Sequence, residues 1–355
     1  MMNKKTDADV SKFIISGTMT VMEALKRIDL NGHGVVFIYE DGKMTGVVSD
    51  GDIRRHILKN GNLNIEVKKI ANAAPQFIRH GSNVNVQEYI RQNRITALPV
   101  LDDKGKIVRI EFDNRGKIYR HLDIHVPVVI MAGGKGTRLA PFTNILPKPL
   151  IPIGDKTITE HIIDRFQRFG CHQFYVIVNY RKNFIKTYFT EQENSPDLFF
   201  IEELKFQGTG GGIKLLEGKI KETFFLTNCD ILVDEDYSSI LDYHKEKKNW
   251  ITLVCATKNI EIPYGTVQVS HEGRVTGFQE KPSFHFLTNT GFYVIEPEFL
   301  NLINKNERID MTDLIQKCID QGKPVGVYPI TENSWMDMGQ LKELENMRIR
   351  LGYMD

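Results

Sequence analysis

The chain has 355 residues, 41% of them hydrophobic, which is enough for two or three domains with cores of their own. Its formal net charge of +1 at pH 7 gives no global field that would favour nucleic acid or an anionic membrane as a partner. The four cysteines form no Cys-x-x-Cys pair, the N-terminus has no apolar core of signal-peptide length, and no run approaches a membrane span. We therefore expect a protein of the reducing cytoplasm, without a disulfide scaffold or a zinc site.

The first third of the chain contains two similar units. Each opens on a predicted capping box ahead of a helix, at Thr20–Glu23 and at Asn85–Glu88. After each helix come a strand, a turn and a second strand. This internal repeat predicts that residues 10–65 and residues 66–120 fold alike.

The repeated unit resembles the cystathionine-β-synthase (CBS) domain, an α+β domain that occurs in pairs and often binds adenine nucleotides. The resemblance assigns residues 1–122 to a tandem CBS pair and implies a regulatory nucleotide site at Ser49 and Asp52, just after the second strand of the first unit. The second unit has Phe112 and Arg115 at the matching positions, so one site at most is implied. Alternatively, Ser49 caps the following helix and binds nothing, because Ser and Asp are good helix starters.

The stretch from Val128 to Leu139 is the most informative in the chain. An apolar, β-branched run breaks into glycines and then meets Arg138, which predicts a buried strand that opens into a phosphate-binding loop. The P-loop motif needs Lys-Ser/Thr after its last glycine, where this chain has Thr137 and Arg138. The dinucleotide fingerprint needs Gly or Ala at Leu139, so a dehydrogenase is excluded as well.

The segments that follow predict an α/β domain over residues 125–355. Apolar strand-like runs at 174–178, 223–227 and 250–255 alternate with helical segments, of which 157–169 has a capping box at Thr157. Such alternation favours a Rossmann-like, mostly parallel sheet with ligands at the carboxyl ends of its strands.

Several separate motifs between Val126 and Gln340 resemble those of sugar-1-phosphate nucleotidyltransferases, including the glycine loop and Pro147-Lys-Pro-Leu150. The resemblance implies a GT-A-like fold and the reaction of a nucleoside triphosphate with a sugar 1-phosphate to give a nucleotide sugar and pyrophosphate. Such a transfer needs positioning and charge neutralisation rather than a general base. Arg138 would neutralise the leaving pyrophosphate, and Lys148, fixed between two prolines, would face the attacking or α-phosphate.

The resemblance also assigns the nucleotide site. The implied nucleotide-binding residues lie in the glycine loop and in the segment 203–212: Ala132, Gly133, Gly134, Gly136, Thr137, Glu203 and Gly208. Glu203 occupies the place that faces the nucleobase. A carboxylate accepts the adjacent N1–H and N2–H donors of guanine as a pair, which favours GTP. A cytosine base, or a solvent-facing Glu203 with no ligand, stays open.

Acidic and basic residues further along suggest a metal and a sugar phosphate. Asp230 follows a buried strand and would bind a hard cation such as Mg²⁺, and the second metal aspartate of the resembling family maps to Asp337. Either carboxylate could instead be a strand-end cap. The sugar 1-phosphate residues that the resemblance implies are Gly265, Glu280, Lys281 and Asn289.

The combination of a CBS pair with this transferase most resembles bacterial glucosamine-1-phosphate guanylyltransferases, which make GDP-glucosamine for legionaminic acid, a nonulosonic acid. Mannose- or heptose-1-phosphate guanylyltransferases, and enzymes that use UTP, dTTP or CTP, are the alternatives within this class. A non-catalytic, nucleotide-sensing regulatory protein is the alternative outside it. We also expect a homo-oligomer.

Overall fold

Two units make up the computed structural model of the chain, Met1–Arg120 and His121–Asp355. The structure describes residues 9–93, 95–112, 123–192 and 196–353, so Arg115 lies outside the described residues. All four cysteines are buried and free. None of the helices in the described ranges combines the length and the apolar character needed to span a bilayer.

The N-terminal unit begins with η1 (Val10–Phe13), β1 (Ile14–Ile15) and α1 (Val21–Asn31), followed by β2 (Val35–Glu40), β3 (Lys43–Ser49) and α2 (Asp50–Asn60). The strands form one sheet in which β2 is parallel to β1 and antiparallel to β3. The capping box predicted at Thr20 and Glu23 is present, and α1 ends at Gly32 in the left-handed conformation.

The second half of this unit repeats the same strand order. After η2 (Val67–Lys69), β4 (Ile78–Arg79) lies parallel to β5 (Ala97–Leu101), which pairs antiparallel with β6 (Ile107–Phe112); α3 (Val86–Gln92) lies between β4 and β5 in sequence. The Asn85 side chain accepts the Glu88 N–H at 3.3 Å, but the Glu88 carboxylate accepts from Gln92. The capping box predicted at Asn85 is therefore only half formed.

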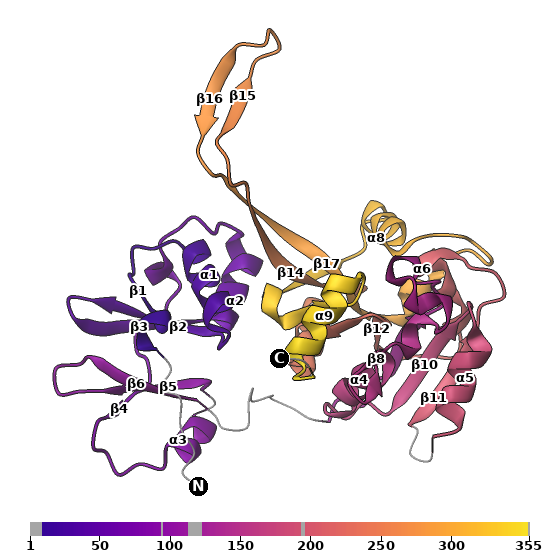
Figure 1. The fold of residues 1–355 in the computed structure, drawn as a ribbon, viewed down its shortest axis with the longest axis horizontal. Coiled ribbons are helices and arrows are strands. Elements are labelled where there is room, and N and C mark those ends of the chain that lie inside the picture. Colours follow the sequence, from indigo (N-terminus) through magenta and orange to yellow (C-terminus); the bar gives the residue numbers. More distant parts are fainter. Residues whose placement is uncertain (1–8, 94, 113–122, 193–195, 354–355) are drawn as a thin grey trace. The chain divides into compact units, whose positions relative to one another are not determined.

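The C-terminal unit is built on a seven-stranded sheet, shown in Figure 1. Its order is β11 (Asp197–Glu202), β10 (Gln173–Val178), β7 (Val128–Ala132), β12 (Phe224–Asn228), β17 (Ser283–Ile295), β14 (Ile251–Glu261) and β18 (Val325–Ile330). The pairs that join β11, β10, β7 and β12 are parallel, as is the pair of β14 with β18, whereas β17 runs antiparallel to both of its neighbours. The predicted α/β class with a mostly parallel sheet is confirmed.

Helices cover both faces of the sheet. They are α4 (Ile158–Gln167), α5 (Lys182–Thr190), α6 (Gly208–Gly211), α7 (Tyr237–Lys247), α8 (Met311–Asp320) and α9 (Leu341–Arg350). Short 3-10 segments join them: η3 (Thr137–Leu139), η4 (Phe142–Asn144), η5 (Lys148–Leu150), η6 (Gly212–Leu216), η7 (Pro297–Leu302) and η8 (Glu332–Ser334). Helix α4 begins at Thr157 with the capping box predicted there.

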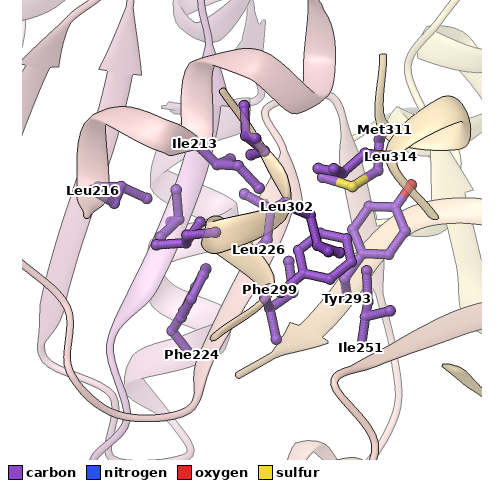
Figure 2. Packing of buried hydrophobic residues seen from close by; sticks show 14 of the residues in the cluster. Ile213, Leu216, Phe224, Leu226, Ile251, Tyr293, Phe299, Leu302, Met311 and Leu314 are labelled. Carbon is purple, nitrogen blue, oxygen red and sulfur yellow. The ribbon is translucent and has the colours of Figure 1, made fainter. Parts of the chain in front are cut away.

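The core of this unit lies on both faces of the sheet because neighbouring residues of a strand point to opposite sides. Phe224 and Leu226 of β12 pack with α8 and η7 on one face, which Figure 2 shows. Phe225, between them, faces the other side, where its ring lies 5.4 Å from that of Phe166 on α4 and 5.9 Å from that of Tyr237 on α7. Two closely packed layers therefore hold the ends of the central strands in place.

Three short two-stranded sheets complete the unit: β8 (Pro152–Ile153) with β9 (Lys156–Thr157), β13 (Ile231–Val233) with β19 (Trp335–Asp337), and β15 (Thr266–Val269) with β16 (Val275–Gln279). The β15–β16 hairpin stands at the end of an arm that β14 and β17 form beyond the sheet (Figure 1). Large apolar side chains on this arm are exposed, among them Tyr264 at 73% and Phe278 at 72%.

Candidate active site

The candidate site lies at the carboxyl ends of β7 and β12, two adjacent parallel strands of the central sheet. Here a cleft of about 280 Å³ opens beside the glycine loop. Most of the predicted nucleotide, catalytic and metal residues line it: Gly133, Gly134, Gly136, Thr137, Arg138, Lys148, Glu203 and Asp230. Ala132 is buried at the end of β7, one residue before the loop.

Two glycines of the loop are required by close contacts. Gly136 has φ +66°, and a Cβ there would lie 3.0 Å from the Cβ of Lys148. A Cβ on Gly133 would lie 3.2 Å from Oε2 of Glu203. The glycines thus let the loop pass between Lys148 on one side and Glu203 on the other, with room for a phosphate at its backbone.

Lys148 and Asp230 form an ion pair across the cleft. Lys148 begins η5, and Asp230 stands between β12 and β13; the two side chains are only 12% and 14% exposed, and Lys148 Nζ donates to Asp230 Oδ2. Removing two charges from water is expensive, and such a pair is weak evidence of a stabilising role. The pair lies at the strand ends beside a glycine loop, and a role in binding or catalysis explains this position better than a role in stability.

A short ladder holds the two predicted metal aspartates together. Asp337 ends β19 and pairs with Ile231, the residue after Asp230, and the Met338 N–H donates to the Asp230 carbonyl at 2.8 Å. Burial and then the negative charge of Asp230 raise the pKa of Asp337, while Lys148, the Gly339 N–H and Arg138 act in the opposite direction.

This donor set fits a hard cation, because two adjacent carboxylates are oxygen ligands whose repulsion a divalent ion relieves. Across residues 9–93, 95–112, 123–192 and 196–353, no three His, Cys, Asp or Glu side chains are arranged to hold a metal. Two protein ligands for Mg²⁺ leave the other coordination positions to substrate phosphates and water, which is the usual arrangement for this ion.

Glu203 is buried, at 3% exposure, so the alternative of a solvent-facing side chain is wrong. Its Oε1 accepts the Gln207 N–H at 2.7 Å, and its main-chain carbonyl accepts from the Asn179 side chain at 2.6 Å. Burial raises the pKa of Glu203, and the Gln207 N–H lowers it. The structure therefore gives this carboxylate one internal partner and a place on the wall of the nucleotide cleft.

Gly208 packs against a neighbouring segment and does not line the nucleotide cleft. It has φ +83°, and a Cβ there would lie 2.5 Å from the carbonyl oxygen of Ile309, which α6 contacts. Sequence reasoning missed six cleft residues: Met131, Phe206, Thr209, Asn228, Cys229 and Gly339. Asn228 and Cys229 could have been found, because they stand between the predicted strand 223–227 and Asp230.

The structure does not bring the implied sugar residues to this cleft. Gly265, Glu280 and Lys281 lie on the arm, whose strands stay paired from Cys255 with Asn289 to Glu261 with Ser283. Lys281 precedes Asn289 by eight residues, which is roughly 25 Å along an extended strand. Asn289 itself donates to the Tyr293 hydroxyl at 2.8 Å and accepts the Gly291 N–H at 3.1 Å.

In the N-terminal unit, Ser49 and Asp52 form a capping box at the start of α2. The Asp52 N–H donates to Ser49 Oγ at 3.2 Å, and the Ser49 N–H donates to Asp52 Oδ2 at 2.9 Å. The capping role that the alternative gave to Ser49 is therefore present. Both residues also line a cleft of about 330 Å³ with Gln76 and Thr96, so a ligand there stays a prediction.

Matches to known protein families fall in both units. The sequence model of the nucleotidyl transferase family matches residues 127–351, and that of the CBS domain matches residues 8–59. A bifunctional protein GlmU of Methanococcus maripaludis is 31% identical over 222 residues, covering 59% of this chain and 51% of that protein. A UTP--glucose-1-phosphate uridylyltransferase of Synechocystis sp. is 30% identical, covering 61% of this chain and 60% of that protein.

A mannose-1-phosphate guanyltransferase of Aspergillus oryzae is also 30% identical, covering 61% of each chain. This chain thus spans between 51% and 61% of the length of these relatives. Among solved structures, HddC from Yersinia pseudotuberculosis has a TM-score of 0.51 at 20% identity, over 64% of this chain and 99% of that one. A structure from Bacillus anthracis, titled as a glucose-1-phosphate thymidylyltransferase, also has a TM-score of 0.51, at 16% identity, over 65% of this chain and 96% of that one. These structural likenesses establish the α/β fold.

The raised pKa of Asp337 predicts a pH-dependent loss of stability. The folded state binds a proton at this carboxyl more tightly than the unfolded state, so ionisation destabilises the fold as the pH rises through the folded-state pKa. We expect Asp337→Asn to raise the urea midpoint at pH 7 in metal-free buffer, and this gain to shrink as the pH falls. The exposed Asp242 on α7 supplies the control, Asp242→Asn. An unchanged or lower midpoint for Asp337→Asn would contradict the prediction.

Proposed function

The chain belongs to the nucleotidyl transferase family, and on this premise we propose that it converts a nucleoside triphosphate and a sugar 1-phosphate to a nucleotide sugar and pyrophosphate. One observation carries the proposal. Arg138 of the glycine loop shares one cleft with Lys148 and Asp230, which come from two other segments. A site that only sensed a nucleotide would not need a cation for the leaving pyrophosphate and paired carboxylates for a metal.

The reaction needs no general base, because the phosphate of a sugar 1-phosphate is already ionised at neutral pH. One of its oxygens forms the new bond to the α-phosphorus as the bond to the pyrophosphate oxygen breaks. Backbone N–H groups of Gly133 and Gly134 hold the triphosphate, and Arg138 neutralises the charge that builds on the pyrophosphate. Lys148 exchanges Asp230 for a substrate phosphate as its partner.

Mg²⁺ held by Asp230 and Asp337 would supply charge neutralisation and orientation for the phosphates. Lys148 pairs with Asp230 and opposes the mutual repulsion of the two carboxylates.

Guanine is the proposed base. Its support is the burial of Glu203 at the wall of the nucleotide cleft, where a carboxylate suits two adjacent N–H donors. Relatives with different named nucleotides, a uridylyltransferase and a guanyltransferase, match this chain about equally well. UTP, dTTP and CTP are therefore the alternatives to test.

Glucosamine 1-phosphate is the proposed sugar substrate, which would make the product GDP-glucosamine, a precursor of legionaminic acid. Mannose 1-phosphate and a heptose 1-phosphate are the alternatives. In this proposal Glu280 and Lys281 meet the sugar phosphate only when the arm bends toward the cleft. Lys281, with φ +43°, stands between the paired strands of the arm and the β15–β16 hairpin, where such a bend would occur.

Replacement of Arg138 tests the transfer reaction itself. We expect Arg138→Ala to lower pyrophosphate release from GTP and glucosamine 1-phosphate by about 100-fold or more, because a preorganised cation at the leaving group is lost. The urea midpoint should stay unchanged. Lys135→Ala removes an exposed cation of the same loop and should keep near-normal activity. If the unaltered chain released no pyrophosphate with any pair of sugar 1-phosphate and nucleotide, a nucleotide-sensing role would replace the enzyme.

Glu203→Gln tests the choice of base. Glutamine can still accept the Gln207 N–H but no longer offers two acceptors to guanine, so kcat/KM for GTP should fall about tenfold and the ratio of GTP to UTP turnover should fall with it. Glu202→Gln is the matched control, because Glu202 pairs with Lys182 and Lys186 outside the cleft. An unchanged preference for GTP would show that Glu203 does not select the base.

A regulatory nucleotide is proposed for the cleft beside Ser49 and Asp52. Calorimetry of the full chain with AMP, which lacks a triphosphate, should show binding that Asp52→Ala abolishes. Thr20→Ala removes a capping box of the same kind from α1 and serves as the control for helix destabilisation. Absence of heat from AMP, or equal binding by Asp52→Ala, would leave Ser49 and Asp52 with the capping role alone.

A further inference from the structure

The loop that follows β11 places an aromatic residue at the nucleotide cleft. Phe206 lines this cleft together with Glu203, three residues earlier in the chain, and no other described residue that lines it is aromatic. Phe206 is 46% exposed, whereas Glu203 is buried. Ligand sites usually combine apolar or aromatic side chains with a few polar groups that fix the orientation of the ligand. Phe206 and Glu203 supply one group of each kind.

The backbone holds Phe206 directly beside the carboxylate that we propose to contact the base. The Gln207 N–H, which belongs to the peptide group between Phe206 and Gln207, donates to Oε1 of Glu203 at 2.7 Å. This hydrogen bond fixes the distance between the backbone of Phe206 and the carboxylate. A base whose polar edge meets Glu203 therefore has its flat face within reach of the Phe206 ring.

The same loop is tied to the beginning of α8 by an exchange of hydrogen bonds. The Thr209 N–H donates to Oδ1 of Asp310 at 3.1 Å, and the Met311 N–H donates to the Thr209 hydroxyl at 3.0 Å. Each segment thus supplies the acceptor for a backbone N–H of the other. The loop is fixed on the C-terminal side of Phe206, so less conformational freedom is lost when the ring contacts a ligand.

We propose that Phe206 is a stacking surface for the nucleobase and that it selects a purine over a pyrimidine. This inference rests on the proposed nucleotide site and adds a specificity-determining residue to it. Every base has a face that can stack on an aromatic ring, and the two fused rings of a purine cover that ring more fully than the single ring of a pyrimidine. A stack carries no hydrogen-bond information, so Glu203 distinguishes guanine from other purines by the edge of the base.

Calorimetry of the full chain without a sugar 1-phosphate measures nucleotide binding apart from turnover. Every variant is made in an Asp52→Ala parent, which removes the nucleotide binding proposed for the N-terminal unit. We expect Phe206→Leu to weaken the binding of GTP about tenfold, because the side chain stays apolar but loses its ring. The binding of inorganic tripolyphosphate, which has no base, should not change. Phe206→Tyr keeps an aromatic ring and should keep the affinity for GTP.

Further nucleotides separate stacking from recognition of the edge. Inosine triphosphate has the purine rings of GTP without the 2-amino donor, so Phe206→Leu should weaken its binding by the same factor as that of GTP. Glu203→Gln should weaken GTP more than inosine triphosphate. UTP has a single ring and should lose less affinity with Phe206→Leu. Leu204→Ala is the matched control and should change no affinity, because Leu204 lies on the same loop, is 87% exposed and does not line the cleft.

Four results would overturn the inference: no binding of GTP to the parent, equal GTP affinity in Phe206→Leu and the parent, a matching loss for tripolyphosphate, or an equal loss for UTP. The outcome is also distinct from that of the proposed reaction. The expected binding pattern without pyrophosphate release from any sugar 1-phosphate would keep the stack and remove the transfer. Pyrophosphate release together with GTP binding that Phe206→Leu leaves unchanged would keep the reaction and remove the stack.

Discussion

The arrangement of the site depends on one short ladder, between β13 and β19. It pairs Ile231 with Asp337 and ties Met338 to the carbonyl of Asp230, so two carboxylates from distant parts of the chain stand together at the end of β12. The same ladder fixes where β19 ends and hence where α9 begins. Without it, Asp337 would not stand beside Asp230.

The ladder brings two negative charges together, so the rest of the unit has to stabilise it against their repulsion. Burial and the charge of Asp230 both raise the pKa of Asp337, which means that the folded state tolerates this acid poorly. The support comes from the sheet: Phe224 and Phe225 anchor β12 to packed layers on its two faces. A rigid core can keep like charges in place, as functional sites often require.

The sequence predicts those parts of the structure that local chemistry determines. The strands β7, β10 and β12 follow from apolar runs, and the glycine loop with Arg138 and Lys148 follows from a contiguous motif. Asp337 required a family pattern, since nothing near it in sequence indicates its partner. The course of the arm, and the use of Glu88 by Gln92 instead of the Asn85 cap, depend on competing contacts that no local pattern reveals.

The residues proposed to perform transfer lie apart from those proposed to choose substrates. The residues proposed to hold phosphates and metal lie at the ends of central strands, which cannot move without disturbing the core. Glu203 follows β11, an edge strand, and the arm extends β14 and β17 beyond the sheet, where substitutions cost the fold less. If the core holds the reacting groups and peripheral segments recognise the substrates, one fold can accept different bases and sugars. Function resides in sites placed on a fold.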